Sequence, residues 1–135
     1  MTLPGTVVRA RVPAELIAVG DETLVVLEVF FDVEDPFAVR LRLHSAGSVA
    51  QWVVDRGCLI DGLTSQGGEG AVQVCSVADS DRPGILLRLE HSGDRTMVMI
   101  DHDALALFLN QCEQLVPYGE ETIDWDLELT YVLSD

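Results

Sequence analysis

Apolar and polar residues alternate along much of the chain, which is the pattern of β-strands with one buried and one wet face. Residues 6–12 alternate in this way, and residues 23–31 form a β-branched and aromatic run that suits a strand buried over most of its length. The alternation is cleanest over residues 37–44. It predicts an inward face of Phe37, Val39, Leu41 and Leu43 and an outward face of Arg40, Arg42 and His44.

Hairpins are predicted at two places along the chain. Residues 49–54 follow the strand of residues 37–44 after the turn "SAGS", and residues 85–100 fold back on themselves around "SGD". Residues 71–77 alternate again and predict one more strand, whereas residues 55–63 suit a helix of one or two turns. The pattern therefore predicts about seven strands with a small helical insert.

The hydrophobic period changes from two to helical spacing near residue 101, where Asp101 or Asp103 can cap a helix. The predicted buried face consists of Leu105, Phe108, Leu109, Cys112 and Leu115. Pro117 ends this helix, and residues 124–133 predict a second one. Strands followed by helices predict an α+β fold, in which one domain, residues 1–135, holds a twisted, mostly antiparallel sheet and two C-terminal helices.

The net charge narrows the classes of function. Eight arginines, no lysine and 23 acids give this chain of 135 residues a formal charge of −15. The last basic residue is Arg95, and nine acids follow it. Binding to nucleic acid or to an anionic membrane needs cations, so the composition opposes both partners and favours contacts with other proteins.

The cysteines indicate the compartment. Cys58, Cys75 and Cys112 are dispersed and odd in number, which indicates a reduced, cytoplasmic chain whose thiols act as small apolar side chains. The N-terminal residues lack the pattern of a signal peptide. The longest apolar run, "LVVLEVFF", is interrupted by Glu28 and is too short to span a bilayer, so no stable membrane insertion is expected.

A cluster of acids at Asp32, Glu34 and Asp35 is the first candidate site. Several carboxylates together can ligate a hard cation. The spacing is not that of a calcium-binding loop, however, and Pro36 biases Asp35 toward extended backbone. We therefore predict that this cluster is a turn that joins two strands.

The other reactive side chains form no catalytic or metal-binding motif. His44, His91 and His102 are scattered rather than paired at zinc spacing, which favours ordinary surface roles. Cys58 lies in a short apolar helical segment, so a packed thiol is predicted. The loop "GGEG", residues 67–70, lacks the spacing of a phosphate-binding loop. No catalytic residue, cofactor or metal ion is expected.

The acidic segment "GEETIDWDLE", residues 119–128, is the candidate partner-binding site. Acids suit a solvated helix start, and an exposed tryptophan supplies contact area. The predicted contacts are Gly119, Asp124, Trp125 and Glu128. Because Gly119 ends the "VPYG" turn and can take positive φ, we expect Gly119→Val to re-aim the second helix and to weaken partner binding more than stability. Loss of cooperative melting in this variant would mean a structural role alone.

Several stretches occur together in one protein family. "DPFAVRLRLH", "VAQWVVDRGCLIDGL", "GEGAVQV", "VPYGEE" and "DWDLELTYVL" follow in order, within a match from about Leu24 to Leu133. In this order and spacing the chain resembles the SsgA-like proteins, small acidic proteins of sporulating actinobacteria. The resemblance is carried by Asp35, Pro36, Phe37, Ala38, Val39, Trp52, Val53, Arg56, Leu59, Gly62, Gly119, Asp124, Asp126, Glu128 and Leu129.

This resemblance implies a fold similar to Whirly-type single-stranded nucleic-acid binders, with a twisted antiparallel sheet curled towards a barrel and helices at its end. It also implies a homotrimer that acts without catalysis in sporulation-specific cell division. The expected partners are the tubulin-like division protein FtsZ, guided or recruited to septum sites, or another SsgA-like protein. The expected localisation is the cytoplasm, with recruitment to the division septum.

One strand departs from the family pattern. After "GEG" many members continue with an acid, an arginine and a Trp-Pro pair, whereas residues 71–76 here read "AVQVCS". The absent indole and guanidinium leave open which paralogue this is and which division protein it binds. Two other functions stay open: binding of single-stranded nucleic acid, suggested by the fold analogy, and binding of a small ligand inside the curled sheet.

Overall fold

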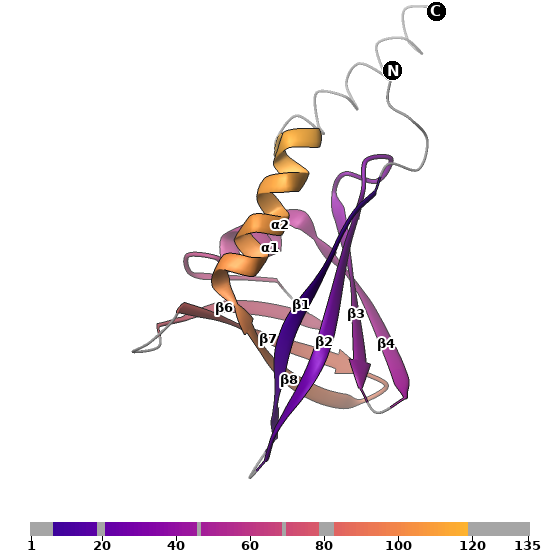
Figure 1. Cartoon of the computed structure of the whole chain (residues 1–135), viewed down its shortest axis with the longest axis vertical. Helices are drawn as coiled ribbons and strands as arrows, with labels where there is room; N and C mark the ends of the chain where they lie inside the picture. The colour runs from indigo at the N-terminus through magenta and orange to yellow at the C-terminus, as the bar shows by residue number, and fades with distance from the viewer. Residues whose placement is uncertain (1–6, 19–20, 46, 69, 79–82, 119–135) are drawn as a thin grey trace, which may run out of the picture.

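In the residues that the structure describes, one antiparallel sheet of eight strands curls around the core, and two helices pack against it (Figure 1). The computed structural model describes residues 7–18, 21–45, 47–68, 70–78 and 83–118. The strands are β1 Val7–Ala18, β2 Asp21–Asp32, β3 Ala38–Ser45, β4 Ser48–Asp55, β5 Gln66–Gly67, β6 Val72–Ala78, β7 Pro83–His91 and β8 Asp94–Asp101. The helices are α1 Arg56–Gly62 and α2 His102–Leu115. The curled antiparallel α+β fold predicted from the sequence is confirmed.

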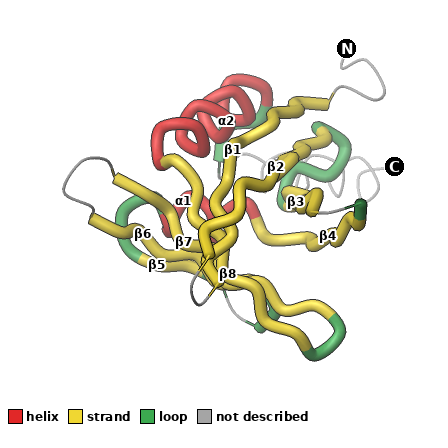
Figure 2. The backbone as a smooth tube through the Cα atoms, turned by 60° about the horizontal axis from the view of Figure 1, so that its bottom comes forward, coloured by secondary structure: helices red, strands yellow, loops and turns green. Residues whose placement is uncertain are grey.

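The sheet bends between β1 and β8, which divides it into two wings, β1–β4 and β5–β8. The inner faces of the two wings lie on the same core (Figures 1 and 2). The strand order of the sheet is β4-β3-β2-β1-β8-β7-β6-β5. β1 connects the wings, because it pairs with β2 along its whole length but with β8 only over Ala14–Leu16. The indole Nε1 of Trp52, on β4, donates a hydrogen bond of 2.7 Å to the Glu90 carbonyl on β7. This bond joins strands that are far apart in the strand order, as a curled sheet requires.

The core lies between the inner faces of the two wings and is closed by α2. The long strands contribute every second residue to this core. The residues between them point to the opposite face of the sheet, which is in contact with solvent. The largest apolar side chains that are almost fully buried there are Phe31, Phe108, Leu27, Leu41, Leu59, Ile85, Leu87, Leu89 and Leu105. On the far wing, α1 lies so close to β6 that a Cβ at Gly62 would overlap the Val74 side chain. Glycine therefore sets the distance between this helix and the sheet.

Local signals of the sequence fix the hairpin of β7 and β8 and the starts of both helices. β7 and β8 join through Ser92 and Gly93, whose φ angles of 52° and 85° suit a two-residue turn between twisted strands. Asp101 caps α2, since its Oδ2 accepts a hydrogen bond of 3.0 Å from the Ala104 amide. Asp55 caps α1 in the same way, by accepting 2.7 Å from the Gly57 amide. The short helix predicted at residues 55–63 is thus confirmed.

The structure differs from the sequence-based prediction in the extent of two strands. The first strand does not end at Val12 but continues past Pro13 to Ala18. Proline is tolerated there because Pro13 lies just before the residues of β1 that gain β8 as a second neighbour. The loop predicted at residues 64–70 holds the two-residue strand β5, whose pairing with β6 depends on a contact distant in sequence.

Two residues predicted to face the core are exposed. Phe37 is 45% exposed, because β3 begins only at Ala38 and the preceding residue still belongs to the turn. Leu115 is 48% exposed, because α2 ends there and Val116 takes the buried position instead. The helix predicted at residues 124–133 lies outside the described residues.

Candidate interaction surface

The outer face of β1, β2 and β3 gathers half of the arginines of the chain. In register across the strands, Arg9 lies opposite Phe30 and Phe30 opposite Arg40. Two residues further along β1, Arg11 lies opposite Glu28 on β2, and Glu28 lies opposite Arg42 on β3. We call Arg9, Arg11, Phe30, Arg40 and Arg42 the arginine face. Side chains directly opposite one another in an antiparallel sheet share a face, so these residues form one continuous surface.

Alternation within each strand turns these residues outward. Val12 on β1, Val29 on β2 and Leu41 on β3 are buried in the core, so the residues on either side of each point to the opposite face. The prediction that Arg40, Arg42 and His44 form the wet face of their strand is confirmed.

Phe30 holds two of the guanidinium groups in place. Arg9, from one neighbouring strand, lies with its guanidinium carbon 4.9 Å from the centroid of the Phe30 ring. Arg42, from the other neighbouring strand, lies 4.6 Å from the same centroid. Both distances are within the range of cation–π attraction, which limits the rotamers of the long side chains. The ring is thereby occupied by cations of this chain.

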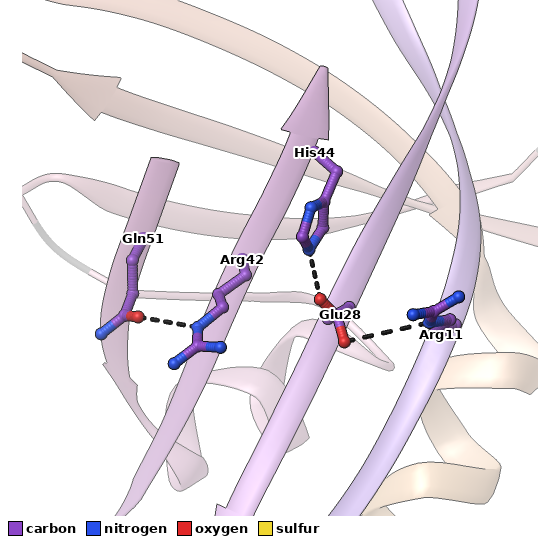
Figure 3. A network of polar contacts seen from close by, with 5 residues as sticks. All are labelled: Arg11, Glu28, Arg42, His44 and Gln51. Carbon is purple, nitrogen blue, oxygen red and sulfur yellow. Dashed lines mark hydrogen bonds and ion pairs between the residues drawn. The ribbon is translucent and has the colours of Figure 1, made fainter. Parts of the chain in front are cut away.

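A second set of polar contacts orders the end of the arginine face that lies away from the β2–β3 turn (Figure 3). Arg42 donates from Nε to Oε1 of Gln51 on β4 at 2.9 Å. Glu28, whose side chain is only 11% exposed, contacts His44 through Oε1 and Arg11 through Oε2, the latter at 3.9 Å. The acid of this face is therefore already in contact with side chains from both neighbouring strands.

A shallow pocket of about 210 Å³ opens at the other end of the arginine face. Arg9, Arg40 and Arg42 line it beside Phe30, with Asp32 and Asp35 at the end nearest the β2–β3 turn. In the part of the chain that the structure describes, no carboxylate forms an ion pair with any of these three arginines. Guanidinium groups carry five N–H donors in a fixed fork, so the pocket can accept carboxylates from another molecule.

The acid cluster Asp32, Glu34 and Asp35 forms the turn that was predicted. The Asp35 amide donates 2.9 Å to the Asp32 carbonyl, and the Glu34 amide donates 2.9 Å to Oδ1 of Asp32. The Ala38 amide then donates 3.3 Å to the Asp35 carbonyl and starts β3. The cluster thus forms the turn that borders one end of the pocket on the arginine face.

The three histidines take separate places, as predicted, and each of them contacts another residue of the chain. His44 contacts Glu28 on the arginine face, and the His91 ring packs edge-on against Trp52 with centroids 5.8 Å apart. His102 lies at the start of α2, where Nε2 is 3.1 Å from the Leu63 carbonyl. Among the described residues, no three His, Cys, Asp or Glu side chains converge in a way that could hold a metal ion.

Arg56, at the start of α1, differs from the other arginines that the structure describes because it is only 1% exposed. Its Nη1 donates a hydrogen bond of 2.6 Å to the Val116 carbonyl beyond α2. Its guanidinium carbon lies 5.0 Å from the Phe31 ring centroid and 5.7 Å from that of Tyr118. One side chain therefore connects α1, β2 and the segment that follows α2.

Because the Cys112 thiol is buried, we expect the free energy of unfolding to depend on pH in the alkaline range. Burial raises the pKa of this thiol to about 12 from an ordinary value of 9.0, although the charge of Arg56 opposes part of the change. The folded chain then holds this proton more tightly than the unfolded chain, so stability falls as pH rises from about 9 towards 12. We expect a loss of roughly 1.4 kcal/mol per pH unit from this group within that window.

Urea unfolding of the wild type and of Cys112→Ala on both sides of pH 9 tests this prediction. The variant loses the packing of the sulfur at every pH, but its stability is expected to fall less steeply above pH 9. Equal slopes in the two proteins would contradict it.

Cys58 is half-buried and packs against the core, in agreement with the packed thiol predicted for it.

Comparison with known proteins decides the family. A family model described as "Streptomyces sporulation and cell division protein, SsgA" matches residues 25–121, from β2 to beyond α2. The chain belongs to the SsgA family. The resemblance inferred from the quoted stretches of sequence is thereby confirmed.

Two relatives and a solved structure extend this match. The "Sporulation-specific cell division protein SsgB" of Kineococcus radiotolerans is 33% identical over 100 residues, which cover 73% of this chain and 61% of that protein. The protein of the same name from Thermobifida fusca is 29% identical over 139 residues, 99% of this chain and 100% of that protein. The crystal structure of an SsgA-like sporulation-specific cell division protein from Thermobifida fusca aligns with a TM-score of 0.83 and 26% identity, covering 97% of this chain and 98% of that one.

The SsgA-family chain has predicted site residues that the structure leaves untested. Gly119, Asp124, Trp125 and Glu128 lie outside the described residues, so partner binding through them stays a prediction. The Whirly likeness and the trimer also stay predictions. No helix of the described ranges is long and apolar enough to cross a membrane.

Sequence reasoning missed part of the surface of this SsgA-family protein. It assigned Arg40 and Arg42 to a wet face but did not join them to Arg9, Arg11 and Phe30. The signal that could have found it is the Arg-x-Arg pattern on two strands, one at residues 9–11 and one at 40–42. The pattern becomes a surface only once the register between β1, β2 and β3 is known.

Proposed function

We propose that this chain acts without catalysis in sporulation-specific cell division, by recruiting or guiding FtsZ to septum sites through protein–protein contacts. Membership of the SsgA family carries the proposal, because the relatives are named sporulation-specific cell division proteins. The arginine face supports it, since protein interfaces are enriched in arginine and aromatic residues. The chain would move from the cytoplasm to the septum with its partner.

A homotrimer is the assembly that we propose for this role. Three linked copies would present three contact surfaces to a polymer of division protein. Binding through several sites raises the overall affinity through effective concentration, even where each contact is weak. Another SsgA-like protein is the second partner that this arrangement suits.

Co-sedimentation with polymers of purified FtsZ tests the proposal. We expect the chain to enter the pellet when FtsZ is polymerised with GTP and to stay in solution when FtsZ is held unpolymerised with GDP. A protein of similar negative charge and unrelated fold serves as the control for trapping. A chain that stays in the supernatant under both conditions would contradict recruitment of FtsZ.

Binding of single-stranded nucleic acid is the alternative that the arginine face brings forward. Such binders combine a positive groove with exposed aromatic rings on which bases stack. Here the ring of Phe30 is occupied by Arg9 and Arg42, and the whole chain carries a charge of −15. Fluorescence anisotropy with a labelled oligonucleotide at low salt separates the two functions, because tight and salt-sensitive binding would favour the alternative.

A further inference from the structure

We infer that the arginine face is a docking site for an acidic segment of a partner polypeptide, one that carries apolar side chains between its carboxylates. The inference rests on the proposed function, because it names the surface through which a protein partner would be held. It commits to a polypeptide rather than to a nucleic acid, a lipid surface or a second copy of this chain.

Charge complementarity is the first observation that carries the inference. The chain as a whole is strongly acidic, yet half of its arginines lie on one face of one wing. Three of them, Arg9, Arg40 and Arg42, surround the pocket of about 210 Å³ without a carboxylate partner among the described residues. Charged hydrogen bonds from guanidinium to carboxylate are about twice as strong as neutral ones. The pocket is therefore suited to an acidic side chain of another molecule.

The modest net charge of the face favours a polypeptide over a polyphosphate. Glu28 lies among the arginines, and Asp32 and Asp35 border the pocket. A polyphosphate chain places a charge at every unit and would meet these three carboxylates. A peptide can direct its few carboxylates to the unpaired guanidinium groups and leave neutral residues beside the acids.

Exposed apolar residues extend the surface beyond the arginines. On β4, Val53 lies opposite Arg40 and is exposed, and Val49 lies opposite His44 and is also exposed. Val26 on β2 shares this outer face and is exposed as well. Because removing apolar surface from water is favourable, a partner segment with alternating acidic and apolar residues fits this surface better than a wholly acidic one.

The fixed positions of the guanidinium groups lower the cost of binding. Arg9 and Arg42 are held over Phe30, and Arg42 is also bonded to Gln51. Long charged side chains lose conformational entropy when a ligand orders them. Here part of that entropy is already lost in the free protein, which is the arrangement of a preorganised site.

A fluorescein-labelled peptide that alternates aspartate with leucine is the probe for this inference, with a serine–leucine peptide as its control. We expect the full chain to bind the acidic peptide and binding to weaken as salt is added, because exposed charges are screened. The charge-reversed double variant Arg9→Glu/Arg40→Glu is expected to lose at least about tenfold in affinity. Arg88→Glu/Arg95→Glu, which reverses two exposed arginines on β7 and β8 and so changes the net charge equally, is the matched control and is expected to bind as the wild type does.

The variants also separate the possible occupants. Equal peptide affinity for the wild type and for Arg9→Glu/Arg40→Glu would overturn the inference. So would an oligonucleotide or vesicles of anionic lipid that displace the peptide and bind more tightly than it does. A changed molecular mass in light scattering after charge reversal would overturn it too, because the occupant would then be a second copy. The milder pair Arg9→Gln/Arg40→Gln repeats the measurement if the first pair melts at a lower temperature than the wild type.

Co-sedimentation of the same variants with FtsZ separates this inference from the proposed function. If the wild type and the double variant enter the pellet equally, the docking site is wrong and the proposed function holds. If the wild type stays in solution while peptide binding depends on Arg9 and Arg40, the proposed partner is wrong and the docking site holds. If the wild type enters the pellet and the double variant does not, the result supports both the docking site and the proposed function.

Discussion

Replacing Arg56 with alanine is expected to lower the free energy of unfolding by about 3 to 4 kcal/mol, measured by urea unfolding. The change leaves the Val116 carbonyl without its buried donor, which costs about 1 to 3 kcal/mol by itself. It also opens space against the rings of Phe31 and Tyr118, where the guanidinium now lies. Because one side chain connects three parts of the fold, the transition should stay cooperative and shift as a whole.

Two further variants check this explanation. Arg56→Lys keeps the charge but loses the flat fork that contacts two rings and a carbonyl, so we expect it to recover less than half of the loss. Arg88→Ala removes an exposed arginine and is expected to change stability by no more than about 0.5 kcal/mol. If Arg56→Ala and Arg88→Ala cost the same, Arg56 is not the structural centre that its burial indicates.

Phe108→Ala is expected to be as damaging, with a loss of about 3 to 5 kcal/mol and a fall in melting temperature of about 10 °C or more. Phe108 is 1% exposed and is the largest apolar side chain that α2 contributes to the core. Its removal leaves a cavity where α2 packs against β1, β7 and β8. Thermal melting followed by circular dichroism measures the effect.

The neighbouring residue supplies a matched control for this prediction. Leu107 lies on the same helix but is 61% exposed, so Leu107→Ala is expected to change stability by no more than about 0.5 kcal/mol. The pair tests which side of α2 faces the sheet. A similar loss in both variants, or a larger one at Leu107, would contradict the packing of this helix.

The sequence predicts best those features that depend on neighbouring residues. The β7–β8 turn follows from "SGD", the start of α2 from Asp101, and the two faces of β3 from strict alternation. Three residues that carried the family resemblance turn out to lie at structural contacts: Trp52 bonds across the sheet, Arg56 is buried, and Gly62 allows α1 to approach β6. Such signals can be read from the chain because each is local or typical of a family.

Features that depend on distant contacts were not predictable in this way. The strand past Pro13 needs the knowledge that β8 pairs with β1 only from Ala14 onward. Leu115 is exposed while Val116 is buried, because the backbone becomes extended at Val116 and its carbonyl accepts a hydrogen bond from Arg56, a residue distant in sequence. Periodicity alone cannot show either of these contacts.

The arginine face is the clearest case of this limit. A net charge of −15 suggests an acidic exterior, and the partner site predicted from the sequence lies in the acidic segment at residues 119–128, where an exposed tryptophan can supply contact area. Strand register instead brings arginines 9, 11, 40 and 42 together on one wing. The sum of charges is a property of the composition, whereas their grouping is a property of the fold.

Arginine footprinting tests the central claim, that a protein partner binds on the arginine face, most directly. Phenylglyoxal labels exposed guanidinium groups, and mass spectrometry assigns the labelled sites with and without FtsZ. We predict that FtsZ slows labelling of Arg9 and Arg40 while Arg88 and Arg95 keep their rates, and that Arg56 stays unlabelled throughout because it is buried. Undiminished labelling of Arg9 and Arg40 in the bound complex would contradict the claim.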